Sequence, residues 1–329
     1  MSRLHVIGIG NALVDVLARV SEPFLAGAGV KKGVMTLIGT ARAAELYAAM
    51  GPAVEVSGGS GANTIAGLAM LGSRVAYVGK VADDQLGRIF AHDLRAQGAL
   101  YDTPPAPGDA GAETGRCLVM VTPDGERSMN TYLGVSEHLA PADIDEALMA
   151  RADWLYLEGY RFDGPDSHAA FAKAIGAVKA AGGRVAATLS DPFCVERHRD
   201  AFRRMVRDEL DLLLANEHEI VALYQAEGLE VALDACAHEV RLAAVTASEK
   251  GAWVIEDGRK THVPTTPRAV VDATGAGDLF AAGFLHGLAE GRDAEAAARM
   301  GCVAAAEVID HIGARPEADL KALMAAAGL

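Results

Sequence analysis

A glycine-rich segment in the C-terminal part of this 329-residue chain carries the strongest chemical signal in the sequence. It reads VDATGAGD over residues 271–278 and runs into the helical pattern LFAAGFLHGL. Unpaired N–H groups at a helix N-terminus, together with the helix dipole, can hold an anion such as phosphate. Asp278 would repel that phosphate, unless it takes a proton from a hydroxyl that attacks the phosphorus. The alternative is that Asp278 only caps the helix.

A second glycine-rich segment, GGSGAN at residues 58–63, precedes the helical pattern TIAGLAML. Three glycines within four residues indicate a backbone that turns sharply or lies close to a ligand. Asn63 offers both a donor and an acceptor, which suits a substrate with several hydroxyl groups. A tight turn with ordinary helix capping is the alternative.

The third candidate segment, GIGNALVD at residues 8–15, ends the first predicted strand. It is not a dinucleotide-binding fingerprint, because Leu13 stands at the third glycine position. Asp15 comes just after the carboxyl end of that strand, where α/β sheets bind their ligands. A carboxylate there can accept hydrogen bonds from two adjacent sugar hydroxyls. A solvated loop acid would look the same in the sequence.

Two further segments follow predicted strands. Asn216 and Glu219 of the NEHE segment share one helix face and could organise hydrated Mg²⁺ near phosphates. The same pair would also be a favourable helix start in any protein. The segment TASEKG at 246–251 could contact nucleotide phosphates, although as a bare loop it carries no functional meaning.

Several common site motifs are absent from the sequence. There is no GxxxxGK[ST], so the chain is not a P-loop enzyme. There is also no HExxH or paired CxxC to indicate zinc, and no GxSxG to indicate a hydrolase.

The elements that must position these segments alternate between short strands and longer helices, which predicts an α/β fold. Such alternation requires a parallel sheet with helices on both faces, because parallel strands need crossover connections. The predicted strands are Leu4–Ile9, Val75–Gly79, Trp154–Glu158, Arg184–Leu189, Asp211–Leu214, Ala243–Thr246 and Trp253–Glu256. The predicted helices include Ala62–Leu71, Gly87–Gln97, Ser167–Ala181 and Leu279–Ala289.

Two stretches interrupt this alternation. Ala12–Ile38 contains two β-like runs and no evident helix between them. Thr114–Leu133 is typical of a hairpin that turns at Pro123-Asp124-Gly125. Pairing the two stretches predicts a small antiparallel sheet outside the main one.

Composition limits the classes of partner. Hydrophobic residues make up 51% and charged residues 22%, which predicts a packed core. The net charge of −14 argues against a nucleic-acid partner. The four cysteines lie far apart, as expected of reduced thiols. No signal peptide or apolar run of about 18 residues is seen, so we expect a cytoplasmic protein without a membrane partner.

Together these segments resemble the ribokinase-like (PfkB) carbohydrate kinases over essentially the whole chain. Within that family the sequence is most similar to the bacterial adenosine kinase group. Ser60 follows the glycine pair where ribokinases carry a lysine, and LSDPF at 189–193 and RSMNTYLG at 127–134 also match that group. The resemblance implies a three-layer α/β/α core with a mainly parallel sheet and a small β-sheet lid. The core would comprise residues 1–11, 50–110 and 136–329, and the lid residues 12–49 and 111–135.

The resemblance also implies roles for individual residues. Asp278 would be the catalytic base, and the amides of Gly275, Ala276 and Gly277 would form an anion hole. Substrate hydroxyls would be bound by Asn11, Asp15, Gly58, Gly59 and Asn63. ATP would be bound by Asn216, Thr246, Ser248, Gly251, Gly275 and Gly277. Glu219 and Asn216 would hold Mg²⁺ through water, and the positions that match a monovalent cation site, for K⁺, are Asp272, Thr274 and 312–314.

The implied activity is ATP-dependent phosphorylation of a nucleoside 5′-hydroxyl, with adenosine converted to AMP. A kinase of a free sugar (ribose or fructose) or of another nucleoside is the alternative. A non-catalytic nucleotide or sugar sensor is a third reading, although a sensor has no need of the base Asp278. A purine would need an apolar pocket, which Met35, Leu37, Met129 or Tyr132 could supply, unless these four only pack a sheet. The family also allows a homodimer through the lid.

Overall fold

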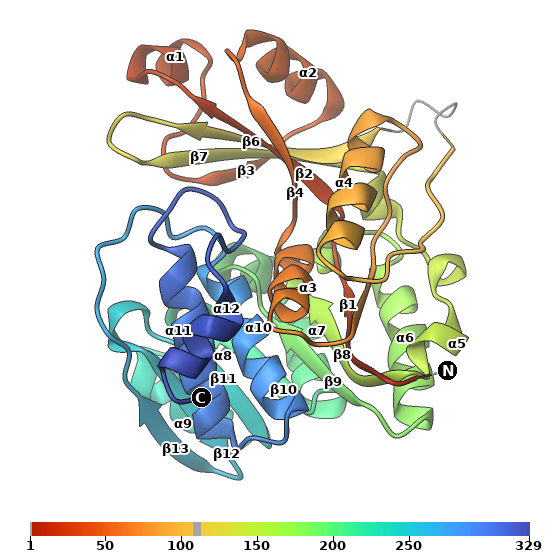
Figure 1. The fold of residues 1–329 in the computed structure, drawn as a ribbon, viewed down its shortest axis with the longest axis vertical. Coiled ribbons are helices and arrows are strands. Elements are labelled where there is room, and N and C mark those ends of the chain that lie inside the picture. Colours follow the sequence, from red (N-terminus) through yellow and green to blue (C-terminus); the bar gives the residue numbers. More distant parts are fainter. Residues whose placement is uncertain (1, 108–112) are drawn as a thin grey trace.

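The main sheet of the protein is built from eight strands in the order β13-β12-β11-β10-β9-β8-β1-β5, in a computed structural model that describes residues 2–107 and 113–329 (Figure 1). Its six strands from β11 to β5 pair in parallel, whereas β12 and β13 are antiparallel. The mainly parallel sheet expected from the alternation of elements is therefore confirmed. The strands are β1 (Leu4–Ile9), β5 (Val75–Val78), β8 (Ala152–Glu158), β9 (Arg184–Thr188), β10 (Leu212–Asn216), β11 (Leu242–Thr246), β12 (Ala252–Glu256) and β13 (Arg259–Val263).

Helices cover both faces of this sheet, because successive side chains of each strand enter opposite hydrophobic layers. In β8, for example, Trp154 and Leu155 belong to different core clusters. The layer with Trp154 contains α3 (Ser60–Met70), α4 (Gln85–Ala96), α10 (Ala276–Ala289), α11 (Ala294–Val308) and α12 (Leu320–Ala326). The layer with Leu155 contains α5 (Glu146–Met149), α6 (Ser167–Ala180), α7 (Pro192–Asp208), α8 (Glu217–Tyr224) and α9 (Leu229–Ala237).

A second, five-stranded sheet lies beyond the carboxyl ends of the main parallel strands (Figure 1). Its strands, in the order β3-β7-β6-β2-β4, are β3 (Met35–Leu37), β7 (Arg127–Gly134), β6 (Thr114–Val121), β2 (Leu13–Arg19) and β4 (Val54–Gly58). The expected hairpin of β6 and β7 is present. The sheet is mixed and not antiparallel throughout as expected, because β2 pairs with β6, and β3 with β7, in parallel, while β6–β7 and β2–β4 are antiparallel.

The expectation of no helix in the segment 12–38 was also wrong. α1 (Glu22–Gly27) lies there, where Ser21 accepts a hydrogen bond from the Phe24 amide and a proline occupies the first turn. With α2 (Thr40–Ala49) it packs on the outer face of the second sheet through Leu25 and Leu46.

Strand β4 also differs from the expected division of the chain. It lies within the residues 50–110 assigned to the core, yet it pairs with β2 in the second sheet. The expected boundary between residues 110 and 111 falls outside the described residues.

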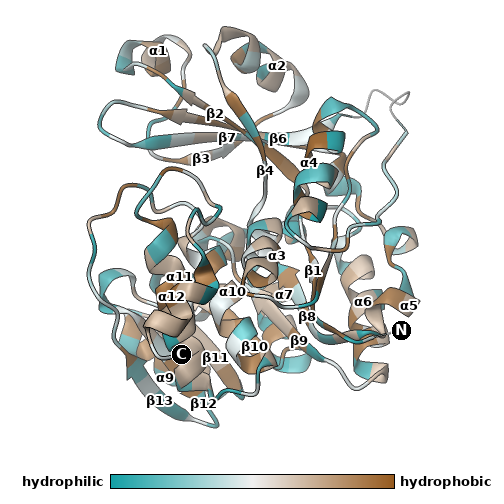
Figure 2. Ribbon diagram, viewed as in Figure 1, coloured by the Kyte–Doolittle hydropathy of each residue, from teal (hydrophilic) through white to brown (hydrophobic). Residues whose placement is uncertain are grey.

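Hydropathy follows this arrangement (Figure 2). Strand β1, which pairs with a neighbour on each side, is coloured hydrophobic, whereas the edge strand β13 is largely hydrophilic. Nonpolar residues on both faces of the central strands are thus buried by the helix layers. Within the described residues, no helix is both long enough and apolar enough to cross a membrane.

Candidate active site

A cavity of about 720 Å³ lies between the second sheet and the carboxyl ends of the main parallel strands. Such strand ends are the usual ligand-binding edge of an open α/β sheet. Most of the residues singled out in the sequence meet there. The cavity is lined by Asn11, Asp15, Gly59, Asn63, Asn216, Glu219, Thr246, Asp272, Thr274, Gly275, Gly277 and Asp278.

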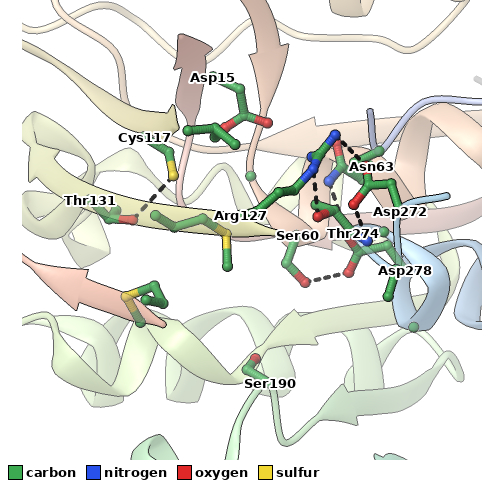
Figure 3. A pocket seen from close by; sticks show the side chains of 18 of the residues that line it. Asp15, Ser60, Asn63, Cys117, Arg127, Thr131, Ser190, Asp272, Thr274 and Asp278 are labelled. Atoms are coloured by element: carbon green, nitrogen blue, oxygen red, sulfur yellow. Dashed lines mark hydrogen bonds and ion pairs between the residues drawn. The ribbon is translucent and has the colours of Figure 1, made fainter. Parts of the chain in front are cut away.

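Asp278 is the third residue of α10, and its carboxylate does not cap that helix. Its Oδ1 accepts a hydrogen bond of 2.6 Å from the Ser60 hydroxyl, and its Oδ2 accepts one of 2.9 Å from Nδ2 of Asn63 (Figure 3). Burial raises the pKa of Asp278, while these two hydrogen bonds oppose the rise. The carboxylate is therefore held at the cavity wall by two side chains from α3.

The N-cap position of α10 is Gly275, whose φ of +81° is the left-handed conformation that favours glycine. A Cβ at this position would lie 2.8 Å from Ala314, so the close packing of the two loops also requires glycine. The Ala276 amide donates to the carbonyl of Ala273 at 3.2 Å. The Gly277 amide lies in the first turn, where an N–H has no acceptor within its own helix and can receive an anion.

Asp15 lies on β2 with its side chain beside Gly58. A Cβ at Gly58 would lie 2.3 Å from Cγ of Asp15, so any larger residue would displace the carboxylate. Burial raises the pKa of Asp15 to about 6, against the lowering effect of the Arg315 charge. No hydrogen bond to this carboxylate is found among the described residues, although it lines the cavity.

Gly59 forms the turn between β4 and α3 with a φ of +90°. A Cβ there would lie 2.3 Å from the carbonyl oxygen of Asn11, which only glycine permits. This contact brings together two segments that connect the main sheet layer with the second sheet, one between β1 and β2 and the other between β4 and α3.

Glu158 is a site residue that the sequence analysis missed. It ends β8, is 1% exposed, and accepts hydrogen bonds from the amides of Asn11 at 3.2 Å and Gly61 at 2.7 Å. Burial raises its pKa to about 7, and these two hydrogen bonds oppose the rise. The signal that could have revealed it is an acid at the end of the apolar run WLYLE. Next to it, buried Arg161 donates to Oδ1 of Asn11 at 3.1 Å.

Arg315 was missed as well, because no local pattern marks it. Its guanidinium donates to the carbonyls of Ala62 at 3.0 Å and Ser57 at 3.2 Å. Burial lowers its pKa to about 10, while the charges of Asp15 and Asp278 oppose this. It thus places a positive charge near Asp15 and Asp278.

Asn216 and Glu219 form a capping box at the start of α8. Oδ1 of Asn216 accepts from the amides of His218 and Glu219, both at 2.9 Å. The Glu219 carboxylate accepts from the Asn216 amide at 2.9 Å and from its Nδ2 at 2.6 Å. Burial raises the pKa of Glu219 to about 7. Asn216 and Glu219 therefore both cap the start of α8 and line the cavity.

These contacts decide how a divalent ion could be held. The described residues contain no group of three or more His, Cys, Asp or Glu side chains arranged to hold a metal. Glu219 faces the cavity but already accepts two hydrogen bonds. Its donor set fits Mg²⁺ held mainly by water and phosphate, a common arrangement for this ion.

The expected nucleotide-binding loop is only partly at the cavity. Thr246 lines it, whereas Ser248 and Gly251 are not among the described residues that do. Gly251 has a φ of +92°, and a Cβ there would lie 2.2 Å from the Val263 carbonyl. Within the described structure its glycine is therefore explained by the turn between β11 and β12.

The expected monovalent cation site does not fit the geometry. Oδ2 of Asp272 lies 2.5 Å from Nη2 of Arg127 and accepts from the Gly313 amide at 2.8 Å. Its Oδ1 accepts from the Thr274 amide at 3.0 Å. Both oxygens therefore face hydrogen-bond donors, one of them charged, where a cation would need free oxygen ligands.

The inner face of the second sheet forms the opposite wall of the cavity. It presents Leu17, Met35, Leu37, Val119 and Met129, all of which line the cavity. Tyr132, expected there as an alternative, is not among the lining residues, because alternate residues of β7 point away. Its ring instead lies 5.9 Å from the Arg116 guanidinium.

Comparison with known proteins gives a consistent result. Residues 34–320 match the pfkB family carbohydrate kinase. A Sinorhizobium meliloti adenosine kinase structure is 46% identical, with a TM-score of 0.93 over 99% of this chain and 100% of its own. A probable sugar kinase structure from Rhizobium etli is 44% identical, with a TM-score of 0.94 over 100% and 99%. The adenosine kinase of Saccharomyces cerevisiae is 28% identical over 94% of this chain and 95% of its own.

Proposed function

The chain belongs to the pfkB family of carbohydrate kinases, and we propose that it transfers phosphate from ATP to the 5′-hydroxyl of adenosine. One observation carries the proposal. The carboxylate of Asp15, which has no hydrogen-bond partner within the described residues, and the carboxylate of Asp278 line the same cavity, opposite an apolar sheet face. Asp15 would match a ribose diol, Asp278 a primary hydroxyl, and the apolar sheet face a flat purine.

In this reaction Asp15 accepts hydrogen bonds from the ribose diol, as a carboxylate can. The 5′-hydroxyl then faces Asp278, which takes its proton as the oxygen attacks the γ-phosphorus of ATP. The bond from that phosphorus to the bridging oxygen breaks, and ADP leaves. Amide groups in the first turn of α10, including that of Gly277, stabilise the charge on the transferring phosphoryl group.

Kinases of this family use ATP and a divalent metal, and we assign Mg²⁺ here. Glu219 and Asn216 line the cavity and would hold the ion through water. Their polar atoms would orient the water molecules bound to the ion. The ion would neutralise charge on the phosphates. Thr246 is the residue of the expected nucleotide loop that lines the cavity.

The purine would lie against Met35, Met129 and Leu37 on the inner face of the second sheet. Flexible methionine side chains adapt to a flat ring and make favourable sulfur–aromatic contacts. Leu37 is 43% exposed, and a bound base would remove part of that surface from water. We infer that the second sheet acts as a lid that excludes water from the reaction.

A sugar kinase is the second candidate, favoured by the likeness to the probable sugar kinase from Rhizobium etli. The discriminating experiment is ADP release with Mg²⁺ and ATP, compared across adenosine, other nucleosides, ribose and fructose. We expect the highest kcat/KM for adenosine. A higher kcat/KM for a free sugar than for every nucleoside would replace the proposal with the sugar-kinase alternative.

A further inference from the structure

A buried arginine from the second sheet reaches into the glycine-rich loop of the core (Figure 3). Arg127, the first residue of β7, places Nη2 at 2.5 Å from Oδ2 of Asp272. Its Nη1 donates to Oγ1 of Thr274 at 3.2 Å. The two paired side chains are only 8% and 2% exposed, so water contributes little to their solvation.

Asp272 needs such a partner, because an isolated buried carboxylate is strongly destabilising. Its other contacts are the amides of Thr274 and Gly313, which are neutral donors. Among the side chains that the structure describes, Arg127 supplies the positive charge at this carboxylate. A guanidinium can meet a carboxylate and a hydroxyl at once through its several fixed N–H groups.

The carboxylate of Asp272 joins the two loops beside α10. Through Thr274 it fixes the segment that leads to Gly275, and through Gly313 it fixes the loop that packs on Gly275. The position of the helix start, and with it the proposed anion-binding amides, depends on this connection. A charge that stabilises Asp272 therefore acts on the reaction through backbone position.

We propose that the Arg127 guanidinium is the resident cation of this site and replaces the monovalent cation that the family resemblance places beside Asp272 and Thr274. Arg127 is then a positioning residue, and neither stability nor activity of the protein requires K⁺. The stability part stands by itself, whereas the activity part rests on the proposed kinase function.

Other charged groups near Arg127 agree with this role. Burial lowers the pKa of Arg127, and the nearby charges of Asp272 and then Asp15 oppose that effect. Burial raises the pKa of Asp15 to about 6, and the charges of Arg315 and Arg127 oppose that rise. The charge of the guanidinium thus acts on both carboxylates.

The test compares melting of the ligand-free protein in KCl and in choline chloride at equal ionic strength. We expect the wild-type melting temperature to be the same in both salts. Arg127→Met removes the charge, so its melting temperature should fall by roughly 5–10 °C in choline and recover partly and saturably in K⁺. Identical curves of Arg127→Met in the two salts would overturn the proposal, as would a saturable stabilisation of the wild type by K⁺.

The matched control is Arg116→Met, from the adjacent strand β6. Arg116 is also largely buried, but it pairs with Glu113 at 3.0 Å and contacts the ring of Tyr47, away from Asp272. The melting temperature of Arg116→Met should be the same in KCl and in choline chloride. A K⁺ response as large as that of Arg127→Met would contradict a local effect.

Two more variants cover the case in which Arg127→Met does not fold. Arg127→Lys keeps the charge and should remain independent of K⁺. The double variant Arg127→Met/Asp272→Asn removes both charges and should also lose the K⁺ response. A K⁺ requirement in either variant would overturn the proposal.

Kinetics in the same salts then test the activity part. The kcat/KM for adenosine should be unchanged by K⁺ in the wild type, and should fall about 10-fold or more in Arg127→Met without K⁺. If no nucleoside or sugar is phosphorylated while the melting data behave as expected, the kinase assignment fails and the resident-cation proposal stands.

Discussion

The Ser60 hydroxyl donates a 2.6 Å hydrogen bond to Oδ1 of Asp278, across 218 positions of sequence. The two residues come from the first turns of different helices, α3 and α10. This bond favours the ionised carboxylate, the form required for a base. It counteracts the effect of burial on the same group.

Removing that bond should change the pH dependence of the reaction. In Ser60→Ala the pKa of Asp278 rises further, because a hydrogen bond to the charged form is lost. The base is then protonated up to a higher pH, so the acidic limb of kcat/KM should move to higher pH. On the alkaline plateau the rate should fall by about 10-fold or less. An unshifted acidic limb would remove Asp278 as the titrating group.

Replacing the base itself should have a larger effect. Asp278→Asn keeps the shape but cannot accept the proton, so kcat should fall by roughly 10²–10⁴. The melting temperature should stay the same or rise, because the replaced carboxylate is buried and resists ionisation. Asp293→Asn, at the N-cap of α11 and exposed to solvent, is the matched control and should keep full activity. Activity of Asp278→Asn within a few-fold of wild type would refute the mechanism.

The metal assignment predicts a change in Mg²⁺ titration. Glu219→Gln should raise the Mg²⁺ concentration for half-maximal rate by about 10-fold, because residues that orient metal-bound water affect metal affinity. Glu217→Gln, two residues earlier in α8 and not among the described residues that line the cavity, should titrate like the wild type. Melting curves of both variants separate this effect from damage to the capping box. Coincident Mg²⁺ titrations for wild type and Glu219→Gln would exclude Glu219 from the metal site.

The ribose contact predicts selectivity for the diol. A site that binds a hydroxyl penalises the analogue without it, so 2′-deoxyadenosine should react with a kcat/KM lower by about 10-fold or more. Asp15→Ala should reduce this discrimination, mainly by slowing the reaction of adenosine. The comparison is the ratio of the two kcat/KM values in each protein. An unchanged ratio in Asp15→Ala would place the diol elsewhere.

The raised pKa of Glu158 should make the stability of the folded protein depend on pH. Its pKa of about 7 in the folded protein exceeds the usual 4.5, so the folded state holds a proton that the unfolded state releases. The free energy of unfolding should therefore decrease as pH rises from about 4.5 through about 7, by about 3 kcal/mol from this group. Urea unfolding at pH 5.5 and 8.0 should show a smaller decrease for Glu158→Gln.

Glu295→Gln is the control for that experiment, because Glu295 is exposed and pairs with Arg299 on the surface of α11. It should keep the wild-type difference between the two pH values. An equal difference in Glu158→Gln would mean that Glu158 ionises normally in the folded protein.

Local patterns predicted the part of the molecule that depends on local chemistry. The glycine-rich helix start and the acid expected after the first strand led to Asp278 and Asp15, which both line the cavity, while their roles stay predictions. The mainly parallel sheet followed from the alternation of elements. The β-hairpin of β6 and β7 was predicted from its turn residues.

Contacts between distant residues were not predictable in this way. Arg127 and Thr274 are 147 positions apart, and no pattern around Arg127 indicates that it enters the core. Arg315 reaches Ser57 across 258 positions. The parallel pairing of β2 with β6 was missed because strand order depends on tertiary packing, which short-range periodicity does not contain.

The discontinuous second sheet has a consequence for the order of folding. Its central pairing joins β2 to β6 across most of the N-terminal third of the chain, and such non-local contacts form slowly because loop closure costs entropy. Its links to the main sheet run directly from β1 into β2 and from β4 into α3. We expect the eight-stranded sheet to form first and to hold these ends together. The amide protons of β2 and β6 should then gain protection from hydrogen exchange later during refolding than those of β1 and β8.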